Sequence, residues 1–325
     1  KYFDFHGNVL LDDTLLQEIS ASERIYIVAC GTSYNAGLAS KDFFFFFSKV
    51  QVEVHLASEF GYYTPILAKK PFFIYLSQSG ETADSRQVLV KTNQLGAPSL
   101  AITNVPGSTL AREAKYALSL EAGPEIAVAS TKAYTAQIAL LSILAYAIQL
   151  EKEDSQLNLL QELTLVEEAM TQVLTQKEHF HQLAKDFFRD TNSAFFIGRG
   201  NDYTVSLEAA LKLKEISYIQ AEGFAAGELK HGTIALIEDG TPVIGLITSE
   251  VTHLHTRGNL EEVKSRGAKT LVISETTFAQ ASDQIILPKA HPLLMSLVSV
   301  VPTQLLAYYA TLERGYDVDK PRNLA

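Results

Sequence analysis

The chain has 325 residues, a length that suits two domains of ordinary size better than one. Hydrophobic residues make up 47% and charged residues 20% of it, which is typical of a soluble globular protein with a sizeable core. The formal net charge of −10 repels phosphate backbones, so composition argues against nucleic acid as a partner. A phosphorylated ligand must therefore be held by local geometry and not by the overall field.

Cysteine content and apolar runs indicate a cytoplasmic protein without membrane contact. The single cysteine, Cys30, cannot form an internal disulfide, and no zinc-ligand spacing is present, which favours a reducing compartment. Residues 1–9 have no apolar signal core. The longest apolar stretch, 138–148, is too short to span a bilayer and predicts a buried helix.

The first half of the chain alternates short apolar runs with segments of helical length. Residues 25–29, 50–56, 72–76 and 100–103 are the runs, and the third of them is apolar throughout. Continuous apolar strands separated by helices predict a parallel sheet that is covered on both faces.

The same order of elements then recurs. Residues 194–197, 243–247 and 270–273 repeat three of the apolar runs, and Arg199-Gly200 follows Cys30-Gly31 by 169 positions. Long apolar helices are predicted near both ends of the pattern, at 135–148 and 302–312. Any two doubly wound domains look somewhat alike, but the preserved order favours internal duplication. We therefore expect an α/β protein of two tandem halves, each a doubly wound, mainly parallel sheet flanked by helices.

The boundaries of the halves follow from composition. Residues 151–177 are rich in Glu, Gln and Leu, and Leu159, Leu163 and Val166 are at helical spacing, which predicts an amphipathic helical connector. The predicted domains are thus 1–150, the connector 151–177, and 178–325.

Three polar loops of the first half could hold a phosphate. Residues 30–33 and 77–82 follow predicted strands, and residues 129–132 open a long helix. In parallel α/β sheets ligands bind at the carboxyl ends of strands, where helix N-termini present unpaired N–H groups. Serine and threonine are also the preferred helix N-caps, so a single such loop would favour simple capping. Several such loops on one edge of a sheet favour phosphate binding.

The corresponding loops of the second half differ. Asp202 stands where the first half has hydroxyls, and residues 247–250 lack the Ser-Gly-Glu-Thr run. We expect that the second copy no longer binds phosphate.

Charged residues of the second half could carry proton transfer. Glu208, Lys212 and Glu215 are at i, i+4 and i+7 and share one face of a predicted helix. Two carboxylates beside an ammonium can keep one carboxylate ionised as a general base, although a solvated Glu–Lys face is the more common meaning of this pattern. Residues 221–232 are small, Gly-rich and charged, and are not predicted to form a regular element. His231 lies in this run and is suited to proton transfer.

Together these segments resemble the isomerase domain of glutamine–fructose-6-phosphate aminotransferase, also called glucosamine-6-phosphate synthase, within the sugar isomerase (SIS) superfamily. SQSGET at 77–82 indicates only the superfamily, whereas AGELKHG at 226–232 and PRNLA at 321–325 are more specific. The resemblance covers nearly the whole chain in order. Other matching stretches are CGTSYNAG at 30–37, ITNVPGS at 102–108, AGPEIAVASTKAYTAQ at 122–137, GRG at 198–200 and LEAALKLKEISYIQAEGF at 207–224.

The resemblance implies the roles of particular residues. Glu215 would move a proton between C1 and C2 of the sugar, Lys212 would support it, and Glu208 would lie in the same site. His231 would assist ring opening from the neighbouring subunit of a homodimer. The ligands would be fructose-6-phosphate, glucosamine-6-phosphate and glucose-6-phosphate, with no metal or organic cofactor. The phosphate would be held by Thr32, Ser33, Ser77, Gln78, Ser79 and Thr82, with Ser130 nearby.

Two departures from the family pattern limit what we expect of the chain as given. The family carries an N-terminal glutaminase domain, and its C-terminus continues past PRNLA to a lysine that forms a Schiff base with the sugar. Neither is in this sequence. We expect sugar-phosphate binding to survive and catalysis through an imine to be crippled.

Residues 43–47 are five consecutive phenylalanines, which would cover every side of a helix. Packing at a subunit interface, or aggregation if exposed, would account for them, and the family resemblance does not.

Two other functions use part of the same evidence. A different SIS-fold sugar-phosphate isomerase or deaminase would share the Ser/Thr loops without needing residues 226–232 or 321–325. A non-catalytic phosphosugar sensor would need the loops but neither Glu215 nor His231. Such sensors often carry a DNA-binding domain, and no basic helix-turn-helix segment is found in this sequence.

Overall fold

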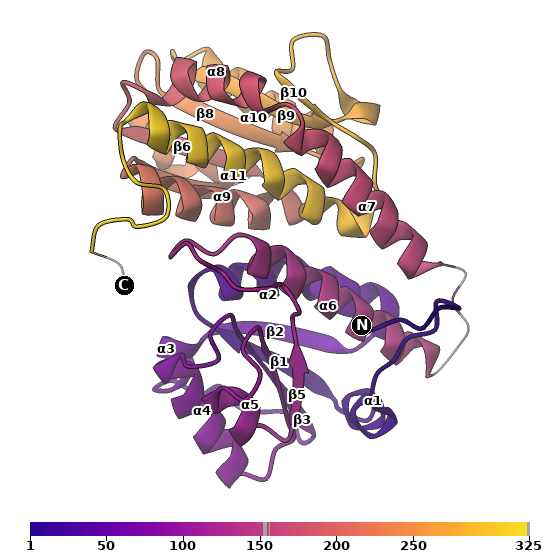
Figure 1. Cartoon of the computed structure of the whole chain (residues 1–325). Helices are drawn as coiled ribbons and strands as arrows, with labels where there is room; N and C mark the ends of the chain where they lie inside the picture. The colour runs from indigo at the N-terminus through magenta and orange to yellow at the C-terminus, as the bar shows by residue number, and fades with distance from the viewer. Residues whose placement is uncertain (152–154, 156, 324–325) are drawn as a thin grey trace. The chain divides into compact units, whose positions relative to one another are not determined.

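The computed structural model describes residues 1–151, 155 and 157–323 (Figure 1). The chain divides into two compact units, each taken by itself below. Unit 1 comprises Lys1–Glu125 and Ser130–Gln161, and unit 2 comprises Ile126–Ala129 and Glu162–Ala325. Of the predicted connector, residues 152–154 and 156 lie outside the described residues, as do Leu324 and Ala325 of the PRNLA segment.

Unit 1 is built on a five-stranded parallel sheet in the order β2-β1-β3-β4-β5. Its three central strands are buried along nearly their whole length, which explains their continuous apolar sequence and confirms the predicted sheet type. The strands are β1 (Arg24–Ala29), β2 (Gln51–Leu56), β3 (Pro71–Ser77), β4 (Ser99–Thr103) and β5 (Tyr116–Ser119).

Helices flank this sheet, and α2 packs against α6, whose residues 140–148 are all buried. The apolar stretch 138–148 is therefore a core helix, as the sequence predicted. The helices of unit 1 are α1 (Asp13–Ser20), α2 (Gly31–Phe43), α3 (Ala57–Phe60), α4 (Ala83–Gln94), α5 (Thr109–Glu113) and α6 (Lys132–Leu150), with a π-helical turn η1 (Phe44–Ser48) continuing α2.

The phenylalanine run lies at the end of α2 and in η1. Phe43, Phe44 and Phe47 are buried, and the Phe47 ring packs edge-on against Tyr146 of α6. Phe45 and Phe46 are 75% and 50% exposed. Three of the five rings thus serve the core of unit 1, and the change from α to π winding accompanies the point where the run turns to solvent.

Unit 2 repeats the design with the strand order β10-β9-β8-β6-β7. Arg24 pairs with Gln51 and Ser193 with Gln220, so one offset of 169 positions relates both strands of each pair. The predicted duplication is confirmed by this common order of parallel strands. The strands are β6 (Ser193–Gly198), β7 (Gln220–Ala225), β8 (Pro242–Ile247), β9 (Lys269–Glu275) and β10 (Ile285–Leu287).

The long helix α11 packs against α9 and α8 in unit 2. The α-helices are α7 (Leu159–Leu174), whose sequence lies in the predicted connector, α8 (Lys177–Phe188), α9 (Asn201–Ser217), α10 (His253–Lys264) and α11 (Met295–Glu313). Short 3₁₀ turns are η2 (Ala226–His231), η3 (Thr233–Leu236), η4 (Thr276–Phe278) and η5 (Pro292–Leu294).

Two helical segments, Lys132–Leu150 and Pro292–Glu313, are long and apolar enough to cross a membrane by composition alone. In each, 72% of the most apolar window is buried inside the protein, so packing in the two cores accounts for their hydropathy.

The prediction for residues 221–232 was wrong. Residues 221–225 belong to the edge strand β7, and Ala226–His231 forms the turn η2. The small side chains that suggested a loop are required by packing, because a Cβ on Gly223 would lie 2.6 Å from the Ser206 carbonyl oxygen of α9. The strand can pair with β6 only if the backbone of α9 comes this close.

Candidate active site

Two of the three polar loops of the first half meet at one edge of the unit 1 sheet. Ala29 pairs with Leu76 in neighbouring parallel strands, so the turn that opens α2 and the loop after β3 leave the sheet side by side. Thr32 and Ser33 lie in the first turn of α2. Six of the predicted phosphate ligands (Thr32, Ser33, Ser77, Gln78, Ser79 and Thr82) therefore lie at the carboxyl end of adjacent strands, where anions bind in such sheets.

The loop after β3 is a closely hydrogen-bonded turn. The Ser77 hydroxyl accepts from the Gly80 amide at 2.9 Å and lies 2.9 Å from the Thr82 hydroxyl. The Ser79 hydroxyl accepts from the Glu81 amide at 3.2 Å. These contacts hold several hydroxyl and amide groups in a fixed arrangement before α4 begins, so little ordering is left for a ligand to impose.

Gly80 is required by the shape of this turn. Its φ is +69°, and a Cβ there would lie 2.0 Å from the Ser108 hydroxyl oxygen. A side chain would both strain the backbone and displace the neighbouring turn. The sequence pattern located Gly80 but gave no signal for Ser108.

Ser33 is held by a residue that sequence reasoning missed. Gln137 of α6 donates a hydrogen bond from Nε2 to the Ser33 hydroxyl at 2.9 Å, and both residues are buried. An amide donor on the oxygen leaves the Ser33 hydroxyl proton to point elsewhere, so the pair favours Ser33 as a donor.

Ser130 lies in different surroundings. Its hydroxyl donates to Glu125 at 3.1 Å, and the Thr131 amide donates to the other oxygen of the same carboxylate at 2.9 Å. A carboxylate is therefore already the anionic partner of this loop.

The predicted charged cluster forms on α9 in unit 2. The Lys212 ammonium lies 2.5 Å from Glu215 Oε2 and 3.7 Å from Glu208 Oε1. The Lys212 and Glu208 side chains are 2% and 0% exposed, and that of Glu215 is 16% exposed. This is no solvated Glu–Lys face. One buried ammonium serves two carboxylates, and only the carboxylate with access to solvent, Glu215, can meet a ligand.

His231 ends η2 and is exposed to solvent. Ala226 and Leu229 of this turn pack in the core of unit 2 and hold the turn in place. It is also fixed by Arg199 of the β6–α9 turn, because a Cβ on Gly227 would lie 2.8 Å from the Arg199 guanidinium nitrogen Nη2. A turn packed on the core of unit 2 thus presents an exposed imidazole, which suits a residue that transfers protons.

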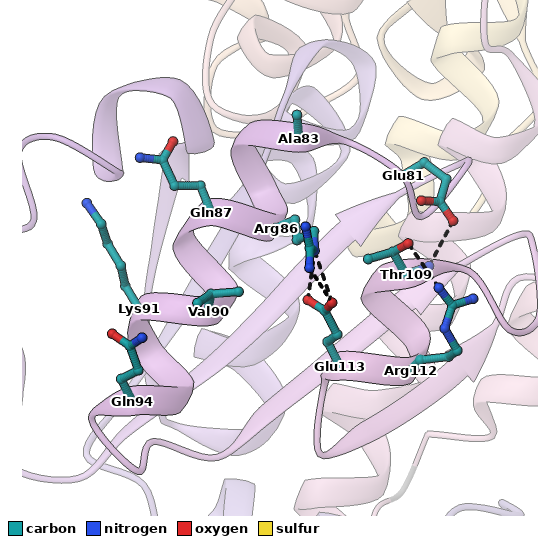
Figure 2. Close-up of a pocket in the computed structure, with 10 residues that line it drawn as sticks. All are labelled: Glu81, Ala83, Arg86, Gln87, Val90, Lys91, Gln94, Thr109, Arg112 and Glu113. Atoms are coloured by element: carbon teal, nitrogen blue, oxygen red, sulfur yellow. Dashed lines mark hydrogen bonds and ion pairs between the residues drawn. The ribbon is translucent and has the colours of Figure 1, made fainter.

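A pocket of about 830 Å³ in unit 1 does not coincide with the phosphate loops. Figure 2 shows it over α4 and α5, where Arg86 and Glu113 point toward one another and pair at 2.7 Å. Glu81 accepts from the Thr109 amide at 2.8 Å, and hydrogen bonding from the Thr109 side chain, and then from its amide, lowers the pKa of the Glu81 carboxyl. Because its facing charges are already paired and none of the predicted phosphate ligands lines it, chemistry and not volume locates the candidate site.

The two five-stranded parallel sheets of the same strand order define an α/β protein built from two tandem repeats. The SIS domain family matches residues 18–147 and 187–314, one match in each repeat. The chain therefore belongs to the SIS-domain family.

Within that family the chain is similar over its whole length to one kind of enzyme. It is 60% identical to glutamine–fructose-6-phosphate aminotransferase (isomerizing) of Bacillus thuringiensis subsp. konkukian and 58% identical to that of Listeria innocua serovar 6a. These alignments cover 100% and 98% of this chain but 54% of each relative, so the chain spans about half the length of the curated relatives it matches.

Solved structures agree with this assignment. The C-terminal domain of glucosamine-fructose-6-phosphate aminotransferase from Francisella tularensis is 35% identical, with a TM-score of 0.90 over 97% of this chain and 92% of that chain. Tagatose-6-phosphate ketose/aldose isomerase from Escherichia coli, at 19% identity and a TM-score of 0.79, covers 96% of this chain and 89% of that chain and shares the fold. The chain thus corresponds to the C-terminal isomerase half of the aminotransferase.

Proposed function

We propose that the chain is the sugar-phosphate isomerase part of a glucosamine-6-phosphate synthase, which binds fructose-6-phosphate and converts the ketose, as the imine formed with the supplied nitrogen, to the aldose glucosamine-6-phosphate. The observation that carries the chemistry is the α9 cluster, in which Lys212 lies 2.5 Å from the partly exposed Glu215 and is itself buried. The 60% identity to the Bacillus aminotransferase over the whole chain supports the choice of substrate.

In this proposal the sugar phosphate is fixed by the hydroxyl and amide groups at the edge of the unit 1 sheet. Thr32, Ser33, Ser77, Gln78, Ser79 and Thr82 supply them, and Ser130 is the outlying member because it already bonds to Glu125. A net charge of −10 makes such neutral, preorganised donors the means of holding an anion.

Glu215 is the proposed general base. Its carboxylate removes a proton from C1 of the open-chain ketose, or of its C2 imine, while the C2 oxygen or nitrogen takes up a proton, so that the C1–C2 double bond of an enediol or enolamine forms. The proton is then returned to C2, and the C1 hydroxyl loses its proton as the C1 aldehyde forms. The Lys212 ammonium lies against Glu215 on one side and against the buried Glu208 on the other, so the proposed base sits beside a positive charge. His231 exchanges the proton needed for ring opening.

The test of this chemistry is proton exchange at C1 of fructose-6-phosphate in D₂O, followed by NMR. Glu215→Gln keeps the size of the side chain and removes its basicity, so we expect exchange to fall by about 10²–10⁴-fold with binding little changed. Glu261→Gln makes the same charge change on the exposed face of α10 and serves as control. Exchange that survives in Glu215→Gln would contradict the proposed base, and a chain that binds the sugar but never exchanges it would be a sensor.

We further propose that the protein is a cytoplasmic homodimer in which His231 serves the neighbouring subunit. The exposed position of His231 at the end of η2 supports a role toward a second chain, and the single half-buried cysteine supports a reducing compartment. In the full-length enzyme a glutaminase domain would supply the nitrogen.

Mixing two inactive variants tests the shared site. If His231 acts across the interface, Glu215→Gln and His231→Ala chains mixed in equal amounts form heterodimers with one intact site, which restores about a quarter of the native exchange rate. If His231 acts within its own chain, every site in the mixture lacks one residue and no activity returns. Sedimentation of the native chain measures the dimer directly.

A further inference from the structure

The loops of unit 2 that correspond to the phosphate loops contain a buried carboxylate. Gly31 and Gly200, 169 positions apart, both open their turns with positive φ, +54° and +58°. The same offset places Asp202 where unit 1 has Ser33. Thr248 is the first residue after β8, as Gln78 is the first after β3.

Both oxygens of Asp202 are bound by this neighbouring loop. Oδ2 accepts from the Thr248 amide at 2.9 Å, and Oδ1 accepts from the Thr248 hydroxyl at 2.5 Å. Asp202 is 2% exposed, and burial raises the pKa of its carboxyl to about 6, against the two Thr248 bonds that lower it. At neutral pH the group is therefore an anion enclosed by an amide and a hydroxyl.

This arrangement differs from an ordinary helix cap. The N-cap of α9 is Gly200, and Asp202 lies inside the first turn, from which its side chain reaches across to the end of the next strand. The donors it uses, one backbone amide and one hydroxyl at the carboxyl end of a parallel strand, are the kind that hold phosphate in such sheets.

The position of Asp202 is fixed by backbone packing. A Cβ on Gly198 would lie 2.4 Å from the Asp202 carbonyl carbon and 2.7 Å from its Cβ, so the last residue of β6 must be glycine for the turn to close. The carboxylate is thus delivered to Thr248 by this tight turn of unit 2.

We propose that Asp202 is a resident anion that occupies the anion position of unit 2 and confines phosphate binding to unit 1. The inference rests on the proposed function, since the anion position is defined by the loops proposed to hold the sugar phosphate. A hydroxyl at this place, as in Ser33, donates to a ligand, whereas a carboxylate consumes the donors and repels a second anion. One residue therefore determines that a duplicated chain binds one phosphosugar and not two.

The experiment follows the Thr248 amide by NMR during titration with inorganic phosphate. In the native chain we expect no saturable shift of this resonance. In Asp202→Ser, which copies Ser33, the freed amide and hydroxyl should give a saturable shift at millimolar phosphate. Asp202→Asn keeps the space filled without the charge and is the control.

Two results would overturn the proposal. One is a saturable Thr248 shift in the native chain, which needs no variant to fold. The other is an unresponsive Thr248 in an Asp202→Ser protein that keeps a cooperative melting transition. The amide resonances of Gly80 and Glu81 report separately on unit 1. If they do not shift when the phosphosugar is added, that result counts against the proposed function and leaves the test of Asp202 unaffected.

Discussion

Gly80 lies so close to Ser108 that a Cβ on the glycine would approach the serine hydroxyl oxygen to 2.0 Å. Gly96, at the end of α4, has nearly the same positive φ, +70° against +69°, but faces open space. Substitution of Gly96 therefore measures backbone strain alone, whereas substitution of Gly80 measures backbone strain together with a steric clash.

We expect Gly80→Ala to destabilise the protein by about 2–4 kcal/mol, because left-handed strain and overpacking add, and Gly96→Ala by about 1–2 kcal/mol from strain alone. Urea denaturation measures both. Adding Ser108→Gly to Gly80→Ala should restore the part of the stability that is lost through the clash with the Ser108 side chain. Equal losses in the free energy of unfolding for the two variants would show that Ser108 moves away from the added Cβ at no energetic cost.

Binding of the sugar phosphate should depend on the Ser79 hydroxyl. We expect Ser79→Ala to weaken calorimetric binding of glucosamine-6-phosphate by about 10–100-fold, the cost of losing one hydrogen bond to a charged group. Ser22→Ala, before β1 at the opposite end of the sheet, should bind as the native chain does.

Unphosphorylated glucosamine and inorganic phosphate are the ligand controls for that titration. Glucosamine that binds as well as its phosphate would place recognition outside the loop after β3. Unchanged affinity in Ser79→Ala would remove this residue from the proposed set.

Most of the strands, but few of the decisive contacts, could be predicted from the sequence. Central strands such as β3 are buried on both faces, so their apolar run is visible in the sequence itself. The edge strands β5, β7 and β10 were missed because they are short or built from small and polar residues, which local periodicity does not distinguish from loops.

The candidate site shows the same limit. The face shared by Glu208, Lys212 and Glu215 follows from helical spacing, and the structure confirms that they meet. The support of Ser33 by Gln137 joins residues 104 positions apart, and the Asp202–Thr248 pair joins residues 46 apart. Contacts at such separations depend on strand order and helix packing, which no single motif records.

Lys212 should be essential to stability as well as to chemistry. Lys212→Met leaves the fully buried Glu208 without its cation, so we expect a loss of about 3–5 kcal/mol in the free energy of unfolding. Lys214→Met, on the exposed side of the same helix, should change it by less than about 0.5 kcal/mol.

The double variant Lys212→Met/Glu208→Gln distinguishes charge from packing. Removing the buried negative charge of Glu208 should restore more than half of the lost stability while proton exchange stays abolished. Stability that does not return would mean that the lysine side chain contributes chiefly by filling space.

Asp202 should make unit 2 less stable as pH rises from about 4 to about 6. Its folded pKa of about 6 lies above the ordinary aspartate pKa of 3.8, so the folded state binds the proton more tightly. The stabilisation is complete below the unfolded pKa and is lost as pH rises through the folded pKa, a change of about 3 kcal/mol. Asp202→Asn removes this dependence, whereas Asp190→Asn at an exposed position keeps it. Parallel pH profiles for native and Asp202→Asn chains would contradict the shift.

The contact between Gly227 and Arg199 should couple the β6–α9 turn to His231. The Arg199 guanidinium donates to Asn259 of α10 at 2.9 Å, so it cannot move away from an added Cβ without breaking that bond. We expect Gly227→Ala to destabilise the protein by about 1 kcal/mol and to lower the exchange rate several-fold with little change in KM, because η2 is displaced and substrate binding is not affected.

Gly258→Ala in α10, where a Cβ meets nothing within 4 Å, controls for the glycine substitution. In an Arg199→Ala background the effect of Gly227→Ala should vanish, since the atom that it strikes is gone. If the two substitutions were simply additive in the exchange rate, Arg199 would not be what holds η2 in place.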